Sequence, residues 1–324
     1  MSQFENLVFE GGGVKGIAYV GALAVLEERG VLTDIRRVGG TSAGAIAASL
    51  VALGADTAKA RRIVTTTPFS SFEDSDFGIF RDLWRLIHRY GWYKGDAFAT
   101  WIRRQIAALS GNPELDFATL ADWAEKAPDK YRRLYVIGTD LSDQRAKVYS
   151  ADTTPDVPIW LAARISMSLP LVFASVERNH DVWVDGGLTW NYPIDLFDHA
   201  RYVEGADGNP DDKIYNKATL GFRVDTRAEI VAAQTRFGPP AVKVDNLISY
   251  AKALIGFMID AANHAHLEPR DWQRTVFIES HGISTTDFDL SDQQISTLIE
   301  SGRLGTEAYF QWFDDAGEKP LNRL

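Results

Sequence analysis

The chain has 324 residues, of which 45% are hydrophobic and 24% charged, as in ordinary soluble globular proteins. Its 34 lysines and arginines against 44 aspartates and glutamates give a net charge of −10, which argues against a nucleic-acid-binding protein, because such a protein needs a basic face. The absence of cysteine excludes a disulfide framework, a thiol nucleophile and any thiolate metal site.

The N-terminus offers no targeting signal. Residues 1–5 lead directly into a strand-like run, without the basic segment and apolar stretch of a signal peptide. No segment reaches the roughly 20 apolar residues that a transmembrane helix requires. We therefore expect a cytoplasmic protein without a signal peptide or a transmembrane segment.

The first fifty residues alternate between strand and helix patterns. Asn6–Phe9 is typical of a buried strand, and residues 14–29 are typical of a helix that ends at Gly30. A second short strand, 35–39, precedes a helix over 42–53 that is apolar almost all round and hence buried. This order indicates a parallel sheet with crossover helices, which places the chain in the α/β class.

The rest of the chain continues in the same way. Residues 65–130 are predicted to be mostly helical and are rich in aromatic side chains. A surface loop is predicted at 204–212, but strands resume after it, so we expect one domain over residues 1–324. Further strands of a parallel sheet are predicted at Arg133–Gly138, Asp181–Asp185, Thr219–Arg223 and Arg274–Glu279.

A Gly-x-Ser-x-Gly motif lies between the second strand and the second helix, with Ser42 between Gly40 and Gly44. In that context the motif predicts a nucleophile elbow, a tight turn that exposes the serine hydroxyl at the edge of the sheet. The glycines are needed because a Cβ would clash at such a turn. The alternative is a glycine-rich turn in which Ser42 only caps the helix, but the strand–turn–helix context favours a nucleophile.

A glycine-rich loop follows the first strand and contains Gly11, Gly12, Gly13 and Gly16. Consecutive glycines let backbone N–H groups point into a cavity, which suits a phosphate or the oxyanion of acyl transfer. The loop also satisfies a dinucleotide-binding pattern, but that pattern needs an acidic residue at the end of the second strand. Here the second strand runs directly into the serine turn, so the cofactor interpretation is rejected. Lys15 either holds the loop, attracts an anionic headgroup or is an ordinary surface lysine.

A third motif, Asp185-Gly186-Gly187, ends a candidate strand at the sheet edge where α/β sites form. A carboxylate there could accept the proton of Ser42 directly. A Ser–His–Asp triad is the alternative, because four histidines follow in the required order. The elbow comes after only two strands, too early for an α/β-hydrolase sheet, so a Ser42–Asp185 pair is favoured. The four histidines are His199, His264, His266 and His281.

Together, in this order and spacing, the three motifs resemble those of patatin-like phospholipases. That family uses a Ser–Asp dyad, with a glycine-rich oxyanion loop ahead of the elbow. The blocks Gly138–Ser142, Ala163–Pro170 and Asp185–Pro193 are also similar to the family. The resemblance covers a motif core of about residues 4–200 and becomes thinner towards the C-terminus.

The resemblance implies a three-layer α/β sandwich with a mostly parallel central sheet. It also implies a lipid acyl hydrolase that works without a metal or other cofactor, on a phospholipid or another fatty-acyl ester. Glu10 stands where the family usually has aspartate, and Lys15 where arginine is frequent. The implied roles are nucleophile for Ser42, general base for Asp185, oxyanion loop for Gly11, Gly12, Gly13 and Gly16, and elbow or turn for Gly40, Gly44, Gly186 and Gly187.

Two alternatives to a phospholipase stay open: a soluble carboxylesterase on small esters, and a catalytically idle lipid-binding or signalling module. The intact serine, aspartate and glycine loop argue against the idle module. Residues 77–94, with their aromatics and arginines, and the apolar stripe of 247–259 are interpreted as core helices rather than membrane contacts. They leave a peripheral membrane contact open, and the sequence does not indicate an oligomeric state.

Overall fold

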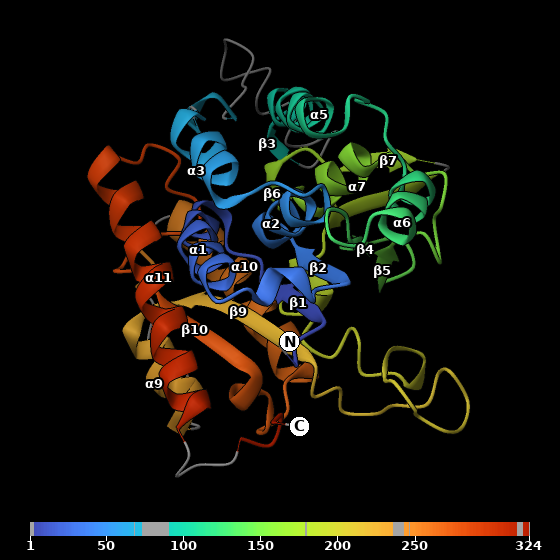
Figure 1. The fold of residues 1–324 in the computed structure, drawn as a ribbon. Helices are drawn as coiled ribbons and strands as arrows, with labels where there is room; N and C mark the ends of the chain where they lie inside the picture. Colours follow the sequence, from blue (N-terminus) through green and yellow to red (C-terminus); the bar gives the residue numbers. More distant parts are fainter. Residues whose placement is uncertain are drawn as a thin grey trace.

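The computed structural model describes residues 3–67, 69–72, 91–178, 180–235, 243–245, 247–315 and 320–323. Figure 1 shows a central sheet with helices on both of its faces, which confirms the predicted α/β fold. No helix in the described part of the chain is long and apolar enough to cross a membrane.

Within the described residues the main sheet has eight strands in the order β10-β9-β1-β2-β4-β8-β7, with β5 paired to β4. The five strands from β10 to β4 are mutually parallel. All four residues of β1 are buried, as expected for a strand covered on both faces. The strands are β1 (Asn6–Phe9), β2 (Arg37–Thr41), β4 (Arg133–Asp140), β5 (Arg145–Tyr149), β7 (Val176–Arg178), β8 (Asp181–Asp185), β9 (Thr219–Asp225) and β10 (Thr275–Glu279).

One predicted strand runs in the opposite direction to the expected one. β8 is antiparallel to both β4 and β7, so its assignment to a parallel sheet was wrong. β7 and β8 form an antiparallel hairpin, in which the first three residues of β8 are half-buried and Val184 and Asp185 are buried.

The strands that carry Ser42 and Asp185 meet end to end beside β4. β4 pairs with β2 as far as Ile137 and with β8 from Gly138 onwards. β5 occupies the other edge of β4 over residues 136–140, so β2 and β8 must share the remaining edge. Because they run in opposite directions, both strands end at this junction, and the residue after β2 lies next to the last residue of β8.

Alternate residues of β1 and β4 pack into two separate apolar cores, one on each face of the sheet. The larger core lies under the helices that stand in front of the sheet in Figure 1, and the smaller one involves the segment that follows β8. Leu7, Phe9, Leu134 and Val136 belong to the larger core, and Val8, Tyr135, Ile137, Ile194 and Phe197 to the smaller.

The first predicted helix has a different start. It begins as a 3₁₀ turn, η1 (Gly13–Ala18), and becomes α-helical only in α1. The predicted buried helix is confirmed as α2. The longer helices are α1 (Tyr19–Glu28), α2 (Ala43–Ala52), α3 (Thr57–Thr66), α5 (Asp96–Ser110), α6 (Phe117–Lys126), α7 (Ile159–Ser166), α9 (Arg227–Thr235), α10 (Leu247–His266) and α11 (Asp292–Asp314).

Most of the described residues between 65 and 130 are helical, as predicted, but a short strand also lies among them. The strand β3 (Gly91–Tyr93) pairs with β6 (Leu171–Phe173) to form a separate two-stranded sheet, which the sequence did not predict. Most of the aromatic segment 77–94 lies outside the described residues. In the stripe of 247–259, Ile255 is buried but Leu254 is 41% exposed, so the predicted burial applies to only part of it.

Candidate active site

Ser42 lies at a sharp turn between β2 and α2. Its backbone has φ 53° and ψ −126°, a region that residues with a side chain rarely adopt. A Cβ on Gly40 would collide with the carbonyl of Gly44, and a Cβ on Gly44 would collide with the carbonyl of Phe9. The two glycines therefore allow the turn to close tightly, and the strained serine backbone is held by its surroundings.

Ser166, at the end of α7, locks this turn. The Ser42 N–H donates to Ser166 Oγ at 2.8 Å, and Ser166 Oγ donates to the carbonyl of Ile137 at 2.6 Å. The Ser42 hydroxyl itself contacts Met167 Sδ at 3.5 Å. Because Ser166 engages the N–H of Ser42, that N–H is not available to a substrate.

Asp185, the last residue of β8, is 1% exposed. Its Oδ1 accepts a hydrogen bond from the Gly187 N–H at 2.7 Å. Its Oδ2 is buried and has no hydrogen-bond partner among the described residues. Burial raises the pKa of this carboxyl to about 7, against the lowering effects of the Gly187 N–H and the nearby Ser42 hydroxyl. A carboxylate with such a pKa can both accept and return a proton near neutral pH.

The Gly186-Gly187 turn shapes the surroundings of Asp185. A Cβ on Gly186 would collide with the carbonyl of Ile137, and one on Gly187 would lie 3.1 Å from Asp185 Oδ1. Both glycines therefore allow the turn to approach β4 and the aspartate closely.

The glycine-rich loop lies beside the Ser42 turn, but its glycines are used in different ways. Gly11 donates its N–H to the carbonyl of Asn191 at 3.1 Å, and Gly13 has a positive φ of 55°. A Cβ on Gly16 would lie 2.8 Å from the Cβ of Ala43, so Gly16 lets the loop pack on α2. Among the described residues, no hydrogen bond engages the N–H groups of Gly12, Gly13 or Ala43.

A buried polar cluster holds the loop from behind. Glu10 Oε1 accepts hydrogen bonds from Asn191 at 3.2 Å and Asn263 at 3.0 Å, and its Oε2 lies 3.3 Å from Arg223 Nε. Arg223 also pairs with Asp225. Burial raises the pKa of Glu10 to about 7, with Arg223 acting in the opposite direction.

Asn191 links this cluster to the loop from two sides. Its Nδ2 donates to the Gly11 carbonyl at 3.3 Å as well as to Glu10, and its own carbonyl accepts the Gly11 N–H. Sequence reasoning missed Asn191, Arg223, Asn263 and Ser166 as site residues. Only the acidic residue ahead of the glycines hinted at such a cluster.

Comparison with known proteins decides the family of this chain. Residues 7–198, more than half of the chain, match the family model described as patatin-like phospholipase. The chain belongs to the patatin-like phospholipase family.

Relatives extend the likeness beyond the matched region. The uncharacterized protein YqhO of Bacillus subtilis is 30% identical to this patatin-like protein, over 94% of this chain and 98% of its own. Lysophospholipase nte1 of Aspergillus niger is 28% identical over 67% of this chain, which spans only 13% of that longer protein. The crystal structure of VipD from Legionella pneumophila shares the fold, with a TM-score of 0.60 at 18% identity over 96% of this chain and 67% of that one.

His199 and His281 do not make the hydrogen bonds that a Ser–His–Asp triad would require. His199 Nδ1 lies 3.1 Å from the Asp211 carbonyl, and neither His199 nor His281 has a hydrogen bond to Ser42 or Asp185 in the described structure. The side chains of His264 and His266 lie outside the described residues. The described part of the chain holds no group of three histidines or carboxylates that could bind a metal ion.

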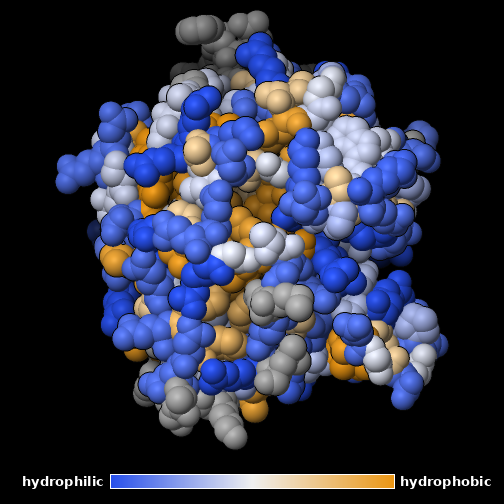
Figure 2. Space-filling view, in the orientation of Figure 1, coloured by the Kyte–Doolittle hydropathy of each residue, from blue (hydrophilic) through white to orange (hydrophobic). Residues whose placement is uncertain are grey.

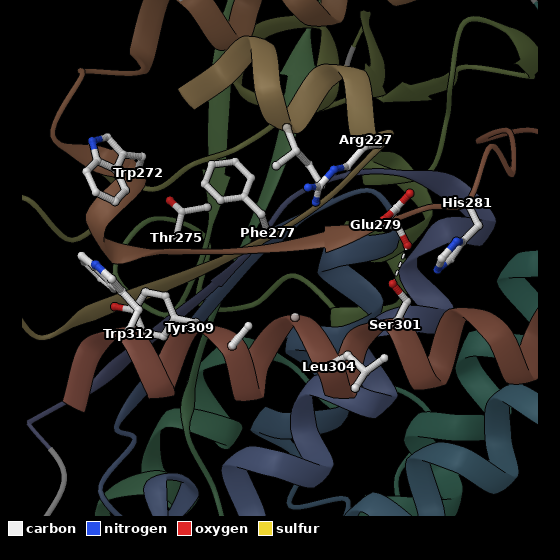
Figure 3. Close-up of a pocket in the computed structure, with 13 residues that line it drawn as sticks. Arg227, Trp272, Thr275, Phe277, Glu279, His281, Ser301, Leu304, Tyr309 and Trp312 are labelled. Carbon is white, nitrogen blue, oxygen red and sulfur yellow. Dashed lines mark hydrogen bonds between the residues drawn. The ribbon is translucent and has the colours of Figure 1, made fainter. Parts of the chain in front are cut away.

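A cavity of about 480 Å³ lies away from the serine turn, between α9, β10 and α11 (Figure 3). It contains a serine, a histidine and a glutamate, the composition of a triad. However, Ser301 Oγ donates to the backbone carbonyl of Glu279 at 2.7 Å rather than to His281, as the dashed line in Figure 3 shows. This cavity therefore does not have the geometry of a hydrolase site.

Proposed function

We propose that this patatin-like protein hydrolyses fatty-acyl esters of phospholipids or lysophospholipids, with Ser42 as nucleophile and Asp185 as general base. Family membership supports a lipid ester hydrolase. The residue roles rest on one observation. Asp185 Oδ2 lies buried near Ser42 without a fixed hydrogen-bond partner, and its carboxyl has a pKa near 7.

In the first half of the reaction, Ser42 Oγ attacks the ester carbonyl while Asp185 takes the hydroxyl proton. The tetrahedral intermediate collapses to an acyl-enzyme, and Asp185 returns the proton to the departing alcohol. In the second half, Asp185 takes a proton from the water that attacks the acyl-enzyme. When the second intermediate collapses and releases the fatty acid, Asp185 returns this proton to the departing Ser42 Oγ.

The oxyanion of each intermediate is assigned to the N–H groups of Gly12, Gly13 and Ala43. These groups have no protein partner among the described residues, and they flank the Ser42 turn. The first residue of α2 adds the positive end of the helix dipole. One such donor typically contributes about 10²–10³ in rate. Gly11 and Gly16 act through the shape of the loop.

The pH dependence of kcat/KM should follow the ionisation of Asp185. The base works only when it is ionised, so kcat/KM rises with pH and levels off above about 7, where the pKa of Asp185 lies.

The first experiment measures free fatty acid released from phosphatidylcholine liposomes and alcohol released from a short-chain chromogenic ester. Wild type is compared with Ser42→Ala and Asp185→Asn. Release from both substrates, lost by about 10³-fold or more in each variant, supports the proposal. Cleavage of the chromogenic ester alone identifies a carboxylesterase on small esters. No release from either substrate rejects hydrolysis and leaves the lipid-binding module.

We also propose a peripheral contact with the lipid surface through α10. Tyr250, Leu254 and Phe257 follow one another at helical spacing and are 56%, 41% and 71% exposed. In liposome flotation, Leu254→Glu with Phe257→Glu should release the protein from the vesicles. Unchanged flotation of that double variant refutes this contact.

We further propose that residues 1–324 act as one catalytic domain. Arg223 and Asn263 lie beyond the region that matches the family model, yet both contact Glu10 at the base of the glycine loop.

A further inference from the structure

Three consecutive residues at the end of α7 contact both members of the Ser42–Asp185 pair. Ser166 Oγ accepts a hydrogen bond from the N–H of Ser42. The carbonyl of Ser168 accepts one from the N–H of Asp185 at 3.0 Å. Between them in the chain, Met167 places its Sδ 3.5 Å from Ser42 Oγ. The Met167 side chain therefore touches the atom that would attack the substrate.

The contact between the Met167 sulfur and the Ser42 hydroxyl is weak. A thioether is a poor hydrogen-bond acceptor and has no proton to donate. The hydroxyl can therefore turn its proton towards Asp185, whose Oδ2 is buried without a hydrogen-bond partner among the described residues. The same sulfur is one of the groups in proteins that peroxides oxidise.

A peroxide can reach this sulfur by the route that serves the substrate. Met167 is 8% exposed and Ser42 is 9% exposed. Since an ester must reach Ser42 Oγ to be hydrolysed, the smaller hydrogen peroxide molecule can reach the sulfur beside it. The chain has no cysteine, the other side chain that peroxides readily oxidise, and its remaining methionines are Met1 and Met258.

The surroundings of Met167 are largely apolar, because its side chain belongs to the larger core. Figure 2 shows apolar side chains that reach the surface over the helices covering this core, in the region where Figure 1 labels α1, α2 and α3. An oxygen atom added to the sulfur would be a strong acceptor that needs a donor in these surroundings. The Ser42 hydroxyl, already in contact with the sulfur, is in position to supply it.

We propose that Met167 is a modification site, at which oxidation by hydrogen peroxide inactivates Ser42; the inference rests on the proposed function of Ser42. The sulfur attacks one peroxide oxygen, so that an S–O bond forms while the O–O bond breaks. The departing oxygen takes the proton of the transferred oxygen and leaves as water. Sulfur loses two electrons and the peroxide gains two, so no further reactant is needed. The sulfoxide oxygen then holds the Ser42 proton away from Asp185.

The size of the effect follows from the role of Asp185. A general base typically contributes about 10²–10⁴ in rate, and the sulfoxide removes this contribution. The fully oxidised protein should therefore be slower by about a hundredfold or more. In a partly oxidised sample, kcat should fall in proportion to the fraction of Met167 that has gained an oxygen.

The test treats the protein with hydrogen peroxide and follows two quantities over time. These are hydrolysis of a butyrate ester and oxygen uptake at each methionine, measured by peptide mass spectrometry. Wild type should lose activity at the rate at which Met167 gains one oxygen. The matched control Met258→Leu removes a half-buried methionine of α10 and should be inactivated equally fast. Met167→Leu has a similar volume and should keep its own untreated rate under peroxide, whatever that rate is.

Several outcomes would overturn the inference while the proposed function stands. They are oxygen uptake at Met167 with undiminished hydrolysis, inactivation that persists in Met167→Leu, and no oxygen uptake at Met167. The wild-type time courses decide the matter even if Met167→Leu is inactive.

A fluorophosphonate probe that labels Ser42 gives a readout without turnover. Failure of the proposed function is recognised because untreated wild type then releases no product. Labelling that is lost on oxidation of Met167 supports the inference even in that case. Labelling that survives full oxidation of Met167 overturns it.

Discussion

The buried general base should cost the folded protein stability at neutral and alkaline pH. Asp185 has a pKa of about 7 in the fold against a reference value of 3.8, because burial disfavours its charged form. At 1.36 kcal/mol per pKa unit, keeping it ionised above pH 7 costs about 4 kcal/mol. Replacement by the neutral Asn removes that cost.

The direction in which the free energy of unfolding changes with pH follows from proton linkage. Between pH 3.8 and about 7 the folded state holds a proton that the unfolded state has lost, so the free energy of unfolding falls as the pH rises through this window. The stability gained by Asp185→Asn is therefore largest above pH 7. At pH 5 it shrinks to about 2 kcal/mol, and it vanishes near the unfolded pKa.

Urea unfolding of wild type and Asp185→Asn at pH 8 and pH 5 measures this effect. The gain should be larger at pH 8 than at pH 5 by about 2–3 kcal/mol. Costs that do not depend on pH, such as an unsatisfied amide hydrogen, cancel between the two conditions, and so does the titration of Glu10. Ser42→Ala is the control, because it is also inactive but keeps the buried carboxyl. A gain that is equal at both pH values would refute the reasoning.

Three further predictions concern the surroundings of the pair. In urea unfolding, Ser42→Gly should be about 1 kcal/mol more stable than Ser42→Ala, because glycine accepts the positive φ at this position. The larger unfolded-state entropy of glycine offsets part of the gain. Equal stability of the two variants would mean that the turn is unstrained. Asn263→Ala should lower kcat for a butyrate ester tenfold to a hundredfold with little change in KM, because Glu10 loses a hydrogen-bond donor and the glycine-rich loop shifts. The control Asn209→Ala, in an exposed loop, should have no effect. A change confined to KM would contradict this prediction. His199→Ala and His281→Ala should retain wild-type turnover, and a loss comparable to that of Ser42→Ala would restore a triad.

The parts of the fold that the sequence predicted are those with short-range signals. Asn6–Phe9 and the apolar helix after Ser42 have local patterns strong enough to give nearly their observed bounds. The direction of β8 was missed, because an alternating five-residue strand does not state which way it runs. β3 and β6 were missed because each has only three residues and they pair with one another across 80 positions.

In the candidate site, too, the residues with short-range sequence signals were predicted and those without them were missed. Glycine spacing around Ser42 and Asp185 reports backbone geometry, which is local, so these residues were found from motifs. Ser166, Asn191 and Asn263 act through hydrogen bonds to distant backbone or to Glu10. A buried asparagine or serine has no sequence signal that separates it from a surface residue, so only the fold reveals its role.

The site gathers its unfavourable features at one place, where the parallel strands end. Ser42 has a strained backbone, Asp185 is a buried carboxyl, and Glu10 and Asp225 are buried charges paired with the mostly covered Arg223. The strands that lead into these residues are anchored in the two cores, since β1 is wholly buried and Phe222 and Val224 on either side of Arg223 are also buried. Apolar packing on both faces of the sheet thus holds the strand ends in positions that their polar side chains would not choose alone. β9 and α10 belong to this arrangement as much as the motif core does, because Arg223 and Asn263 give Glu10 the partners that keep its carboxylate under the glycine loop.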